Sequence, residues 1–253
     1  MIPKISVIMP YYKKRQFVLK AINSVLNQSY KNLEIIIVHD DINLNDLIFL
    51  KKKFNKNKKI KFIVNNKNVG AGNSRNKGIK VSTGQYIAFL DSDDFWHKDK
   101  LKLQLNFMIS RKLLISHTNF FIVDKKSEII GKFSPKKIIT YKYLLKSCDI
   151  GLSTVIIKKK LMINYKFSNI KTKEDYAVWL KIIKKIKKIM CFDKYLTFWR
   201  NTPDSLSSSL IQKLKDAFTL YYKYEKQNFF KSIFLIFQLS LYALKKKIII
   251  KLK

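Results

Sequence analysis

Residues 68–96 read NVGAGNSRNKGIKVSTGQYIAFLDSDDFW, and this stretch decides the fold. A loop rich in Asn and Gly leads into a segment at 74–81 that predicts a helix, and the apolar run YIAFL at 86–90 predicts a strand. The run ends in Asp-Ser-Asp at 91–93, which we name the DSD turn. A buried strand that carries carboxylates at its carboxyl end indicates a ligand site at that end.

The same alternation of strand and helix precedes this stretch. Three further apolar runs predict buried strands, and two segments with helical spacing lie between them. The strands are expected at 5–9, 33–38 and 60–64, and the helices at 17–28 and 44–54. Alternation of this kind predicts an α/β fold with a doubly wound, mainly parallel sheet.

Beyond the DSD turn the pattern is less regular. We expect helices at 101–109, 141–146 and 173–186, one or two strands within 113–123, and single strands at 153–157 and 195–199. From 210 onward the spacing is helical. These elements predict one domain over 1–209, followed by C-terminal helices over 210–253.

Polar side chains follow three of the predicted strands at the point where each strand ends. Tyr11 and Tyr12 follow the first strand, Asp40 and Asp41 the second, and the DSD turn the fourth. The carboxyl ends of parallel strands lie at one edge of a sheet, and ligands bind beyond that edge. The sequence therefore predicts a single site to which all three clusters contribute.

The DSD turn offers the carboxylates of Asp91 and Asp93 to a divalent metal. Mg²⁺ and Mn²⁺ favour hard oxygen ligands and commonly share them with substrate phosphates. A metal there would neutralise charge on a departing nucleoside diphosphate. The alternative is an Asp-rich turn that caps the following helix, and Asp94 is the acid best suited to capping.

The chain has a formal net charge of +35, and nearly all of its basic residues are lysines. Arginine occurs only at Arg15, Arg75, Arg111 and Arg200. Nucleic-acid surfaces use arginine more heavily, because the guanidinium fork pairs with phosphates and bases, so we expect no nucleic-acid partner. The lysine content is typical of an AT-rich genome, and attraction to an anionic membrane is the second interpretation.

Two features indicate a cytoplasmic setting. Cys148 and Cys191 are the only cysteines, so no disulfide framework is expected. The residues after Met1 enter an apolar strand directly, without the basic and longer apolar regions of a secretory signal.

The segment at 229–244, FFKSIFLIFQLSLYAL, is strongly apolar and is followed by lysines at 245–247. Its uninterrupted part is shorter than the roughly 20 residues that a transmembrane helix needs. One interpretation is a helix in the membrane interface, which predicts peripheral attachment to the inner face of the cytoplasmic membrane. The other is a helix packed on the domain or on a dimer partner, and the oligomeric state stays open.

Four stretches of the sequence resemble family-2 glycosyltransferases, which have the GT-A fold. Residues 68–96 resemble the family's core signature, and residues 6–12 (SVIMPYY) are similar to its first nucleotide-contacting strand. Residues 33–41 resemble its second strand with an acidic pair, and residues 173–180 (KEDYAVWL) resemble its "ED" motif. Within the family, the chain is most similar to bacterial enzymes that build lipopolysaccharide, capsule or teichuronic-type polysaccharides.

The resemblance implies an inverting, metal-dependent transferase that moves one sugar from a UDP-sugar to a glycan or a lipid-linked glycan. Residues 1–100 would form the nucleotide-sugar-binding half and residues 101–209 the acceptor half. Mn²⁺ or Mg²⁺ is the implied cofactor, held by Asp93 together with Asp91. No motif within 101–173 specifies the sugar, the acceptor or the linkage.

The resemblance also assigns roles to single residues. Those implied to contact the nucleotide-sugar are Pro10, Tyr11, Asp40, Arg75, Asp91 and Ser92. Asp40 would accept hydrogen bonds from the uracil, although Ile42 and Asn43 replace the Gly-Ser that commonly follows the acidic pair. Arg75 would pair with a phosphate or a carboxylate, and its alternative role is a structural ion pair with one of the site acids.

Asp175 of the ED motif is the implied general base. Inversion by direct displacement needs a carboxylate that takes the proton of the acceptor hydroxyl, opposite the leaving diphosphate. The alternative for Asp175 is capping of the helix that it opens.

Two other function classes remain open. A nucleotide-sugar pyrophosphorylase usually has a Gly-rich loop after its first strand, and the sequence MPYY at 9–12 contains no glycine. A basic protein that binds nucleic acid or lipid would show salt-sensitive binding and no affinity for UDP and metal.

Overall fold

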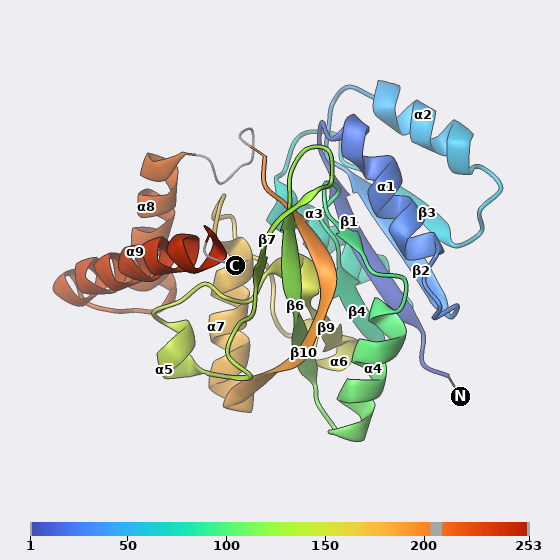
Figure 1. Ribbon diagram of the computed structural model, residues 1–253. Helices are drawn as coiled ribbons and strands as arrows, with labels where there is room; N and C mark the ends of the chain where they lie inside the picture. The colour runs from blue at the N-terminus through green and yellow to red at the C-terminus, as the bar shows by residue number, and fades with distance from the viewer. Residues whose placement is uncertain (1, 203–208, 252–253) are drawn as a thin grey trace.

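The computed structural model describes residues 2–202 and 209–251, except for the side chains of 247–251. It has a central ten-stranded sheet with helices on both faces (Figure 1). The strand order is β3-β2-β1-β4-β9-β6-β10-β5, while β7 pairs with β6 and β8 pairs with β10. The predicted α/β class is therefore confirmed.

The first half of the sheet is parallel throughout, as the sequence predicts. Its elements are β1 (Ile5–Tyr11), α1 (Arg15–Leu26), β2 (Leu33–His39), α2 (Asn45–Phe54), β3 (Ile60–Val64), α3 (Ala71–Val81) and β4 (Tyr86–Phe89). Strand β1 continues past Pro10, because the backbone carbonyl of Tyr11 still accepts a hydrogen bond from Asp40 at 2.8 Å.

Strand β1 is apolar on both faces because helices cover both of them. Val7 and Met9 pack in the core that contains α1 and α4 (Lys100–Ser110). Ile8 points the other way, into the core that contains α3 and α7 (Glu174–Ile186). This double coverage fixes the register of β1 and places its last residues at the carboxyl edge of the sheet.

The second half of the sheet is mixed. Its strands are β5 (Phe95–Trp96), β6 (Ile115–Val123), β7 (Ile129–Phe133), β8 (Ile138–Thr140), β9 (Ile156–Lys158) and β10 (Lys188–Arg200). Strands β6 and β10 are parallel, but β9 runs antiparallel to both β4 and β6. Its helical pieces are α5 (Tyr141–Leu144), α6 (Lys159–Met162) and the 3-10 turn η1 (Leu152–Thr154).

Several predictions for this half need correction. The strand expected at 153–157 begins only at Ile156, because η1 occupies the preceding residues. The strand expected at 195–199 is the end of the longer β10. Strands β5, β7 and β8 were not predicted, because they are short and β7 and β8 keep several apolar side chains exposed.

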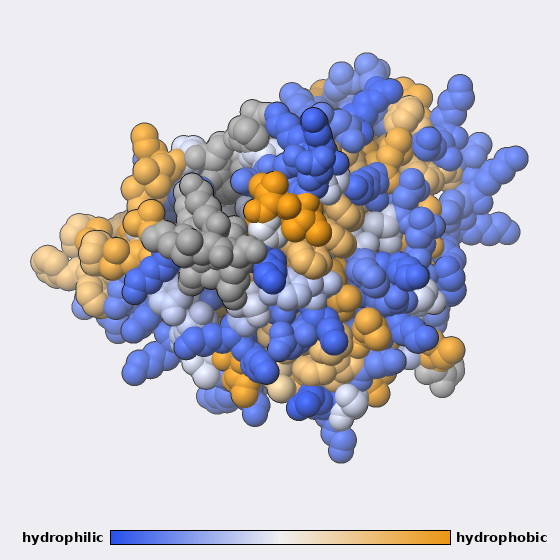
Figure 2. All heavy atoms as spheres, in the orientation of Figure 1, coloured by the Kyte–Doolittle hydropathy of each residue, from blue (hydrophilic) through white to orange (hydrophobic). Residues whose placement is uncertain are grey.

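The C-terminal region is helical, as predicted, with α8 (Leu210–Thr219), a π-helical turn η2 (Leu220–Tyr224) and α9 (Phe229–Lys251). One side of α9 packs on the domain through Leu235 and Leu239. Its other side exposes large apolar residues, among them Phe230 at 84% and Phe237 at 60%. Figure 2 shows hydrophobic side chains at the end of the molecule formed by α8 and α9. Within the described residues, no helix has the length and apolarity needed to cross a membrane.

Candidate active site

The DSD turn directly follows β4 at the carboxyl edge of the sheet. The backbone N–H of Leu90 donates to the Ile8 carbonyl at 3.1 Å, so the turn begins beside the end of β1. The N–H of Asp94 then donates to the Asp91 carbonyl at 3.0 Å and closes the turn. The predicted convergence of β1, β2 and β4 is therefore present in the structure.

Arg75 on α3 connects the DSD turn with the ED motif. Its Nη2 donates to Asp91 Oδ1 at 2.7 Å, and its Nη1 donates to Glu174 Oε1 at 2.6 Å. Burial alone lowers the pKa of Arg75, but the two carboxylates outweigh burial and raise it. The ion pair with a site acid, left open by the sequence, is present, and contact of Arg75 with a phosphate stays a prediction.

Asp175 lies half-buried at the start of α7, next to this bridge. Its Oδ1 accepts a hydrogen bond from the N–H of Tyr176 at 2.7 Å. Burial, followed by repulsion from Glu174, raises the pKa of Asp175 to about 7. A carboxyl group with this pKa can accept a proton near neutral pH. Its role as a base stays a prediction, and the bond to Tyr176 shows that it also contacts its own helix terminus.

Asp40, at the end of β2, holds the loop that enters α3. Its Oδ1 accepts from the N–H of Val69 and from Asn65 Nδ2, and its Oδ2 accepts from the N–H of Gly70, each at 2.8 Å. Gly70 has φ +83°, a conformation that favours glycine. Asp40 therefore fixes the start of the helix that carries Arg75. Its predicted contact with the uracil has no direct support in these bonds and stays a prediction.

The side chain of Tyr11, the last residue of β1, is fully buried. Its ring stacks on the ring of His39 at a centroid distance of 5.4 Å, and its hydroxyl donates to Asp46 Oδ2 at 2.5 Å. Arg15 Nη1 lies 3.2 Å from the other carboxylate oxygen of Asp46. Asp46 was not predicted. The contacts of Tyr11 and of the preceding Pro10 with a nucleotide stay predictions.

The carboxylates of the DSD turn can contribute to a cation site. Asp93 Oδ2 lies 3.2 Å from Lys14 Nζ. Burial and the charge of Asp91 raise the pKa of Asp93, which Lys14 partly offsets. No group of three or more His, Cys, Asp or Glu side chains within the described part of the chain is placed to hold a metal. Divalent metals often take their remaining ligands from substrate phosphates, and the assignment of Asp91 and Asp93 to such a metal stays a prediction. Ser92 between them is buried.

Asp94 does not cap the following helix, so that prediction is wrong. Helix α4 begins only at Lys100, and Asp94 is buried beneath the DSD turn. Its carboxylate accepts from Ser153 Oγ at 2.6 Å and from the Arg200 N–H at 2.8 Å. Burial, with the charges of its neighbouring acids, raises the pKa of Asp94 well above its usual value.

From the sequence, Arg200 is only the first residue of a loop over 200–209 that similar enzymes close near the donor, and most of that loop lies outside the described residues. In the structure Arg200 is a buried residue at the end of β10. Its Nε donates to the Asp93 carbonyl at 2.8 Å, and its Nη1 donates to the Lys125 carbonyl at 2.9 Å. Arg200 therefore joins the DSD turn to the turn between β6 and β7. The rarity of arginine in this lysine-rich chain, which drew attention to Arg75, is a signal that applies equally to Arg200.

Comparison with known proteins places these residues in a family. The family model described as Glycosyl transferase family 2 matches residues 6–169. A putative teichuronic acid biosynthesis glycosyltransferase of Bacillus subtilis, TuaG, is 33% identical over 97% of this chain and 98% of its own length. The Escherichia coli UDP-Glc:alpha-D-GlcNAc-diphosphoundecaprenol beta-1,3-glucosyltransferase WfgD is 36% identical over 83% of this chain and 82% of its own.

The fold agrees with these sequence matches. The crystal structure of S. aureus TarS 1–349 in complex with UDP-GlcNAc superposes with a TM-score of 0.71. The superposition covers 95% of this chain and 71% of the TarS chain, at 18% sequence identity. At this identity the similarity is one of fold, and it is the GT-A fold implied by the motifs.

Proposed function

This chain belongs to glycosyl transferase family 2 and is a glycosyltransferase, and on that premise we propose that it moves one sugar from a UDP-sugar to a lipid-diphosphate-linked glycan. The pathway is synthesis of a bacterial surface polysaccharide. The observation that carries the proposal is the Arg75 bridge, because it brings the DSD turn and Asp175 to one place although they lie far apart in sequence.

The sugar is transferred with inversion, and Asp175 acts as the base. The acceptor hydroxyl attacks the anomeric carbon of the donor, its proton passes to the Asp175 carboxylate, and UDP leaves from the opposite face. Lys14 and Arg75 lie beside the site acids and offset negative charge where the diphosphate departs. A divalent cation, Mn²⁺ or Mg²⁺, held by Asp91 and Asp93 would add Lewis-acid stabilisation of the leaving group.

The choice of donor and acceptor follows the relatives. WfgD, by its name, uses UDP-Glc and an acceptor in which GlcNAc is attached to diphosphoundecaprenol. TarS binds UDP-GlcNAc. Uridine as the donor nucleoside and a polyprenyl diphosphate on the acceptor are therefore the first substrates to test. The division into a nucleotide half over 1–100 and an acceptor half over 101–209 is part of the same proposal.

The protein attaches to an anionic membrane through α8 and α9. Their exposed apolar residues form what we name the apolar end: Leu210, Ile211, Leu214, Phe229, Phe230, Ile233, Phe234, Phe237 and Leu241. A net charge of +35 complements an anionic bilayer, and a lipid-linked acceptor is presented at such a surface.

Vesicle flotation tests this attachment. We expect the triple variant Phe230→Ser, Phe234→Ser, Phe237→Ser to bind phosphatidylglycerol vesicles about tenfold more weakly than the wild type. The control replaces three exposed isoleucines outside the apolar end, Ile48, Ile109 and Ile163, with serine. Equal flotation of the wild type and the first variant would remove the apolar end as the attachment surface.

Thermal shift with a panel of donors tests the function itself. UDP-, GDP- and dTDP-sugars are added with and without Mn²⁺, because a ligand that binds the folded state raises Tm. We expect one UDP-sugar to stabilise the protein, and more strongly with Mn²⁺ than without it. Transfer is then measured with Asp93→Ala and Asp175→Ala. No stabilisation by any UDP-sugar, or wild-type transfer rates in both variants, would contradict the proposal.

A further inference from the structure

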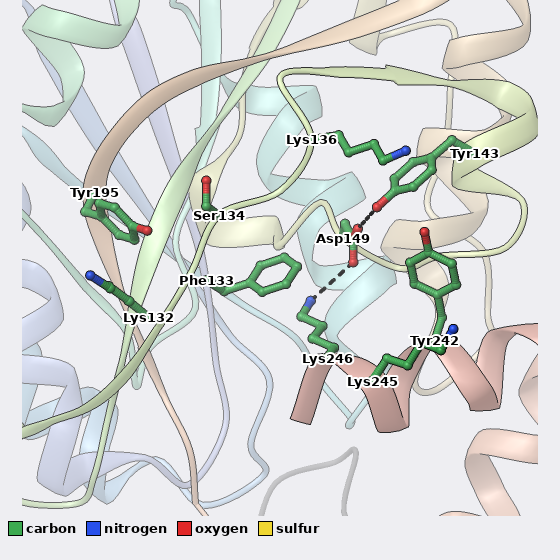
Figure 3. A pocket seen from close by; sticks show the side chains of 10 residues that line it. All are labelled: Lys132, Phe133, Ser134, Lys136, Tyr143, Asp149, Tyr195, Tyr242, Lys245 and Lys246. Atoms are coloured by element: carbon green, nitrogen blue, oxygen red, sulfur yellow. Dashed lines mark hydrogen bonds and ion pairs between the residues drawn. The ribbon is translucent and has the colours of Figure 1, made fainter. Parts of the chain in front are cut away.

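A cavity of about 280 Å³ lies between β7, α5 and α9, apart from the DSD turn (Figure 3). Four of its lining residues are lysines, Lys132, Lys136, Lys245 and Lys246, and one is an acid, Asp149. In Figure 3, Lys136 comes from the loop after β7 and lies beside Tyr143, while Lys246 comes from α9 and points toward Asp149. Elements far apart in the sequence therefore bring positive charge to one hollow.

Both carboxylate oxygens of Asp149, the one acid in the lining, already have partners. Asp149 Oδ2 accepts from the Tyr143 hydroxyl at 2.5 Å, and Asp149 Oδ1 lies 3.5 Å from Lys246 Nζ. Within residues 2–202 and 209–251, no carboxylate forms an ion pair with the other three lysines. The cavity thus has an excess of positive charge, and an anion with several oxygens suits it.

The wall of the cavity is aromatic as well as basic. Lys246 Nζ lies 3.7 Å from the centroid of the Phe133 ring and 5.6 Å from that of Phe120. Phe120 packs edge-on against Trp199, which is 40% exposed. An exposed tryptophan ring is a surface on which a sugar ring can stack.

One segment, 148–154, connects this cavity with the DSD turn. Asp149 lines the cavity, while Ser153 Oγ accepts from the Asp91 N–H at 3.1 Å and donates to Asp94. The cavity and the DSD turn are therefore joined by one short segment of the chain.

We propose that the lysine-lined cavity binds the diphosphate of a lipid-linked acceptor. The acceptor sugar then lies between the cavity and Asp175, next to Trp199. The lipid chain extends along α9, which contributes Lys245 and Lys246 to the cavity and carries much of the apolar end. Lysine ammonium groups bind phosphate oxygens as point charges and tolerate variation in geometry. This assignment rests on the proposed function and adds the acceptor's charged group to it.

The test uses two acceptors with the same sugar and alkyl chain, one joined through a diphosphate and the other an alkyl glycoside. The variant Lys132→Gln, Lys136→Gln, Lys245→Gln removes three exposed charges and leaves the ion pair of Lys246 in place. Its control, Lys52→Gln, Lys56→Gln, Lys58→Gln, removes three exposed charges near α2. We expect the cavity variant to raise KM for the diphosphate acceptor about tenfold, with kcat, donor KM and the alkyl-glycoside KM unchanged.

Unchanged KM for the diphosphate acceptor, or equal loss with both acceptors, would overturn the proposal. Equilibrium binding of the diphosphate acceptor without donor is measured on the same proteins, so the cavity is read out even if transfer fails. Weaker acceptor binding by the cavity variant supports the cavity as the diphosphate site even if the wild type shows no transfer. Absence of transfer would then count against the proposed function alone.

Binding of the same proteins to phosphatidylglycerol vesicles is the second experiment. If the cavity variant loses vesicle binding but keeps diphosphate-acceptor binding, the cavity is a phospholipid headgroup site and the proposal is wrong.

Discussion

Two charged regions of the molecule differ in how firmly their side chains are fixed. One is the carboxyl edge of the sheet around the DSD turn, Arg75 and Glu174, which we name the donor edge after its proposed role, and the other is the lysine-lined cavity. At the donor edge, Asp91 and Glu174 are fixed by the buried guanidinium of Arg75, and Asp94 accepts the backbone N–H of Arg200. In the cavity, three of the four lysines are exposed. The donor edge is therefore preorganised, whereas the cavity can adapt to its ligand.

This difference predicts how each region responds to substitution. Removing one member of a buried ion-pair network leaves the charges of its partners uncompensated, which costs much more than the pair contributes. Removing an exposed lysine costs only the contact that it makes with its ligand. Effects at the donor edge should therefore be large and should include stability, while effects at the cavity should be confined to KM.

The largest effect is expected for Asp175→Asn. The amide oxygen can still accept from the Tyr176 N–H, so the fold is kept, but the amide cannot take a proton. We expect kcat to fall by about 10²–10⁴-fold, the range for loss of a general base. The measurement is transfer under saturating donor and acceptor, with donor binding followed by thermal shift. A variant with wild-type kcat would show that Asp175 only contacts its helix terminus.

Arg75→Gln should follow, with its main effect on stability. The substitution leaves the carboxylates of Asp91 and Glu174 without the charge that now lies 2.7 and 2.6 Å from them. We expect the free energy of unfolding to fall by about 3–5 kcal/mol in urea denaturation. Arg15→Gln is the control, since its pair with Asp46 is half-exposed and its loss should stay within about 1 kcal/mol. If the free energy of unfolding fell by a similar amount in both variants, the buried ion pairs of Arg75 would contribute no more than the half-exposed pair of Arg15.

The pH dependence of kcat/KM should show a smaller, graded effect. The proposed base Asp175 must be a carboxylate to take a proton, and burial and Glu174 raise its pKa to about 7. Activity should therefore rise about tenfold per pH unit below 7 and level off above it. Repulsion from Glu174 contributes to the raised pKa, so Glu174→Gln should move the inflection to lower pH. An inflection that stays at the same pH in this variant would assign the titration to another group.

The sequence predicted the donor edge better than the cavity, for a physical reason. Strands β1, β2 and β4 are covered on both faces, so they appear as continuous apolar runs that end abruptly at polar residues. The DSD turn and the ED motif are each contiguous in sequence and could be found there. The partners of the site could not, because Ser153 lies 62 positions from Asp91 and Arg200 lies 106 from Asp94.

The cavity left no comparable pattern in the sequence. Its lysines come from the end of β7, the following loop and α9, and each is one of many in a chain with 52 basic residues. Strand β7, which contributes Lys132 and Phe133 to its lining, is short and partly exposed, so its alternation is weak. The packing of α9 on the domain, which the sequence left as one of two alternatives, is what brings Lys245 and Lys246 to the cavity.

The smallest effect is expected for Ser153→Ala, which tests whether the two regions act independently. The substitution removes the hydroxyl that donates to Asp94 at 2.6 Å and accepts from the Asp91 N–H at 3.1 Å. Asp94 keeps its bond from the Arg200 backbone, so we expect a loss of about 1–3 kcal/mol in stability and a few-fold rise in donor KM. Ser110→Ala, whose hydroxyl is exposed, is the control and should change stability by less than about 0.5 kcal/mol.

Acceptor KM in the Ser153→Ala variant decides the question of independence. Ser153 and Asp149 lie on the same segment, 148–154, but only Ser153 contacts the DSD turn. If the donor edge and the cavity act separately, acceptor KM should match the wild type while donor KM rises. If acceptor KM rises by the same factor, the segment transmits the disturbance to the cavity. The donor edge and the cavity would then be coupled through residues 148–154.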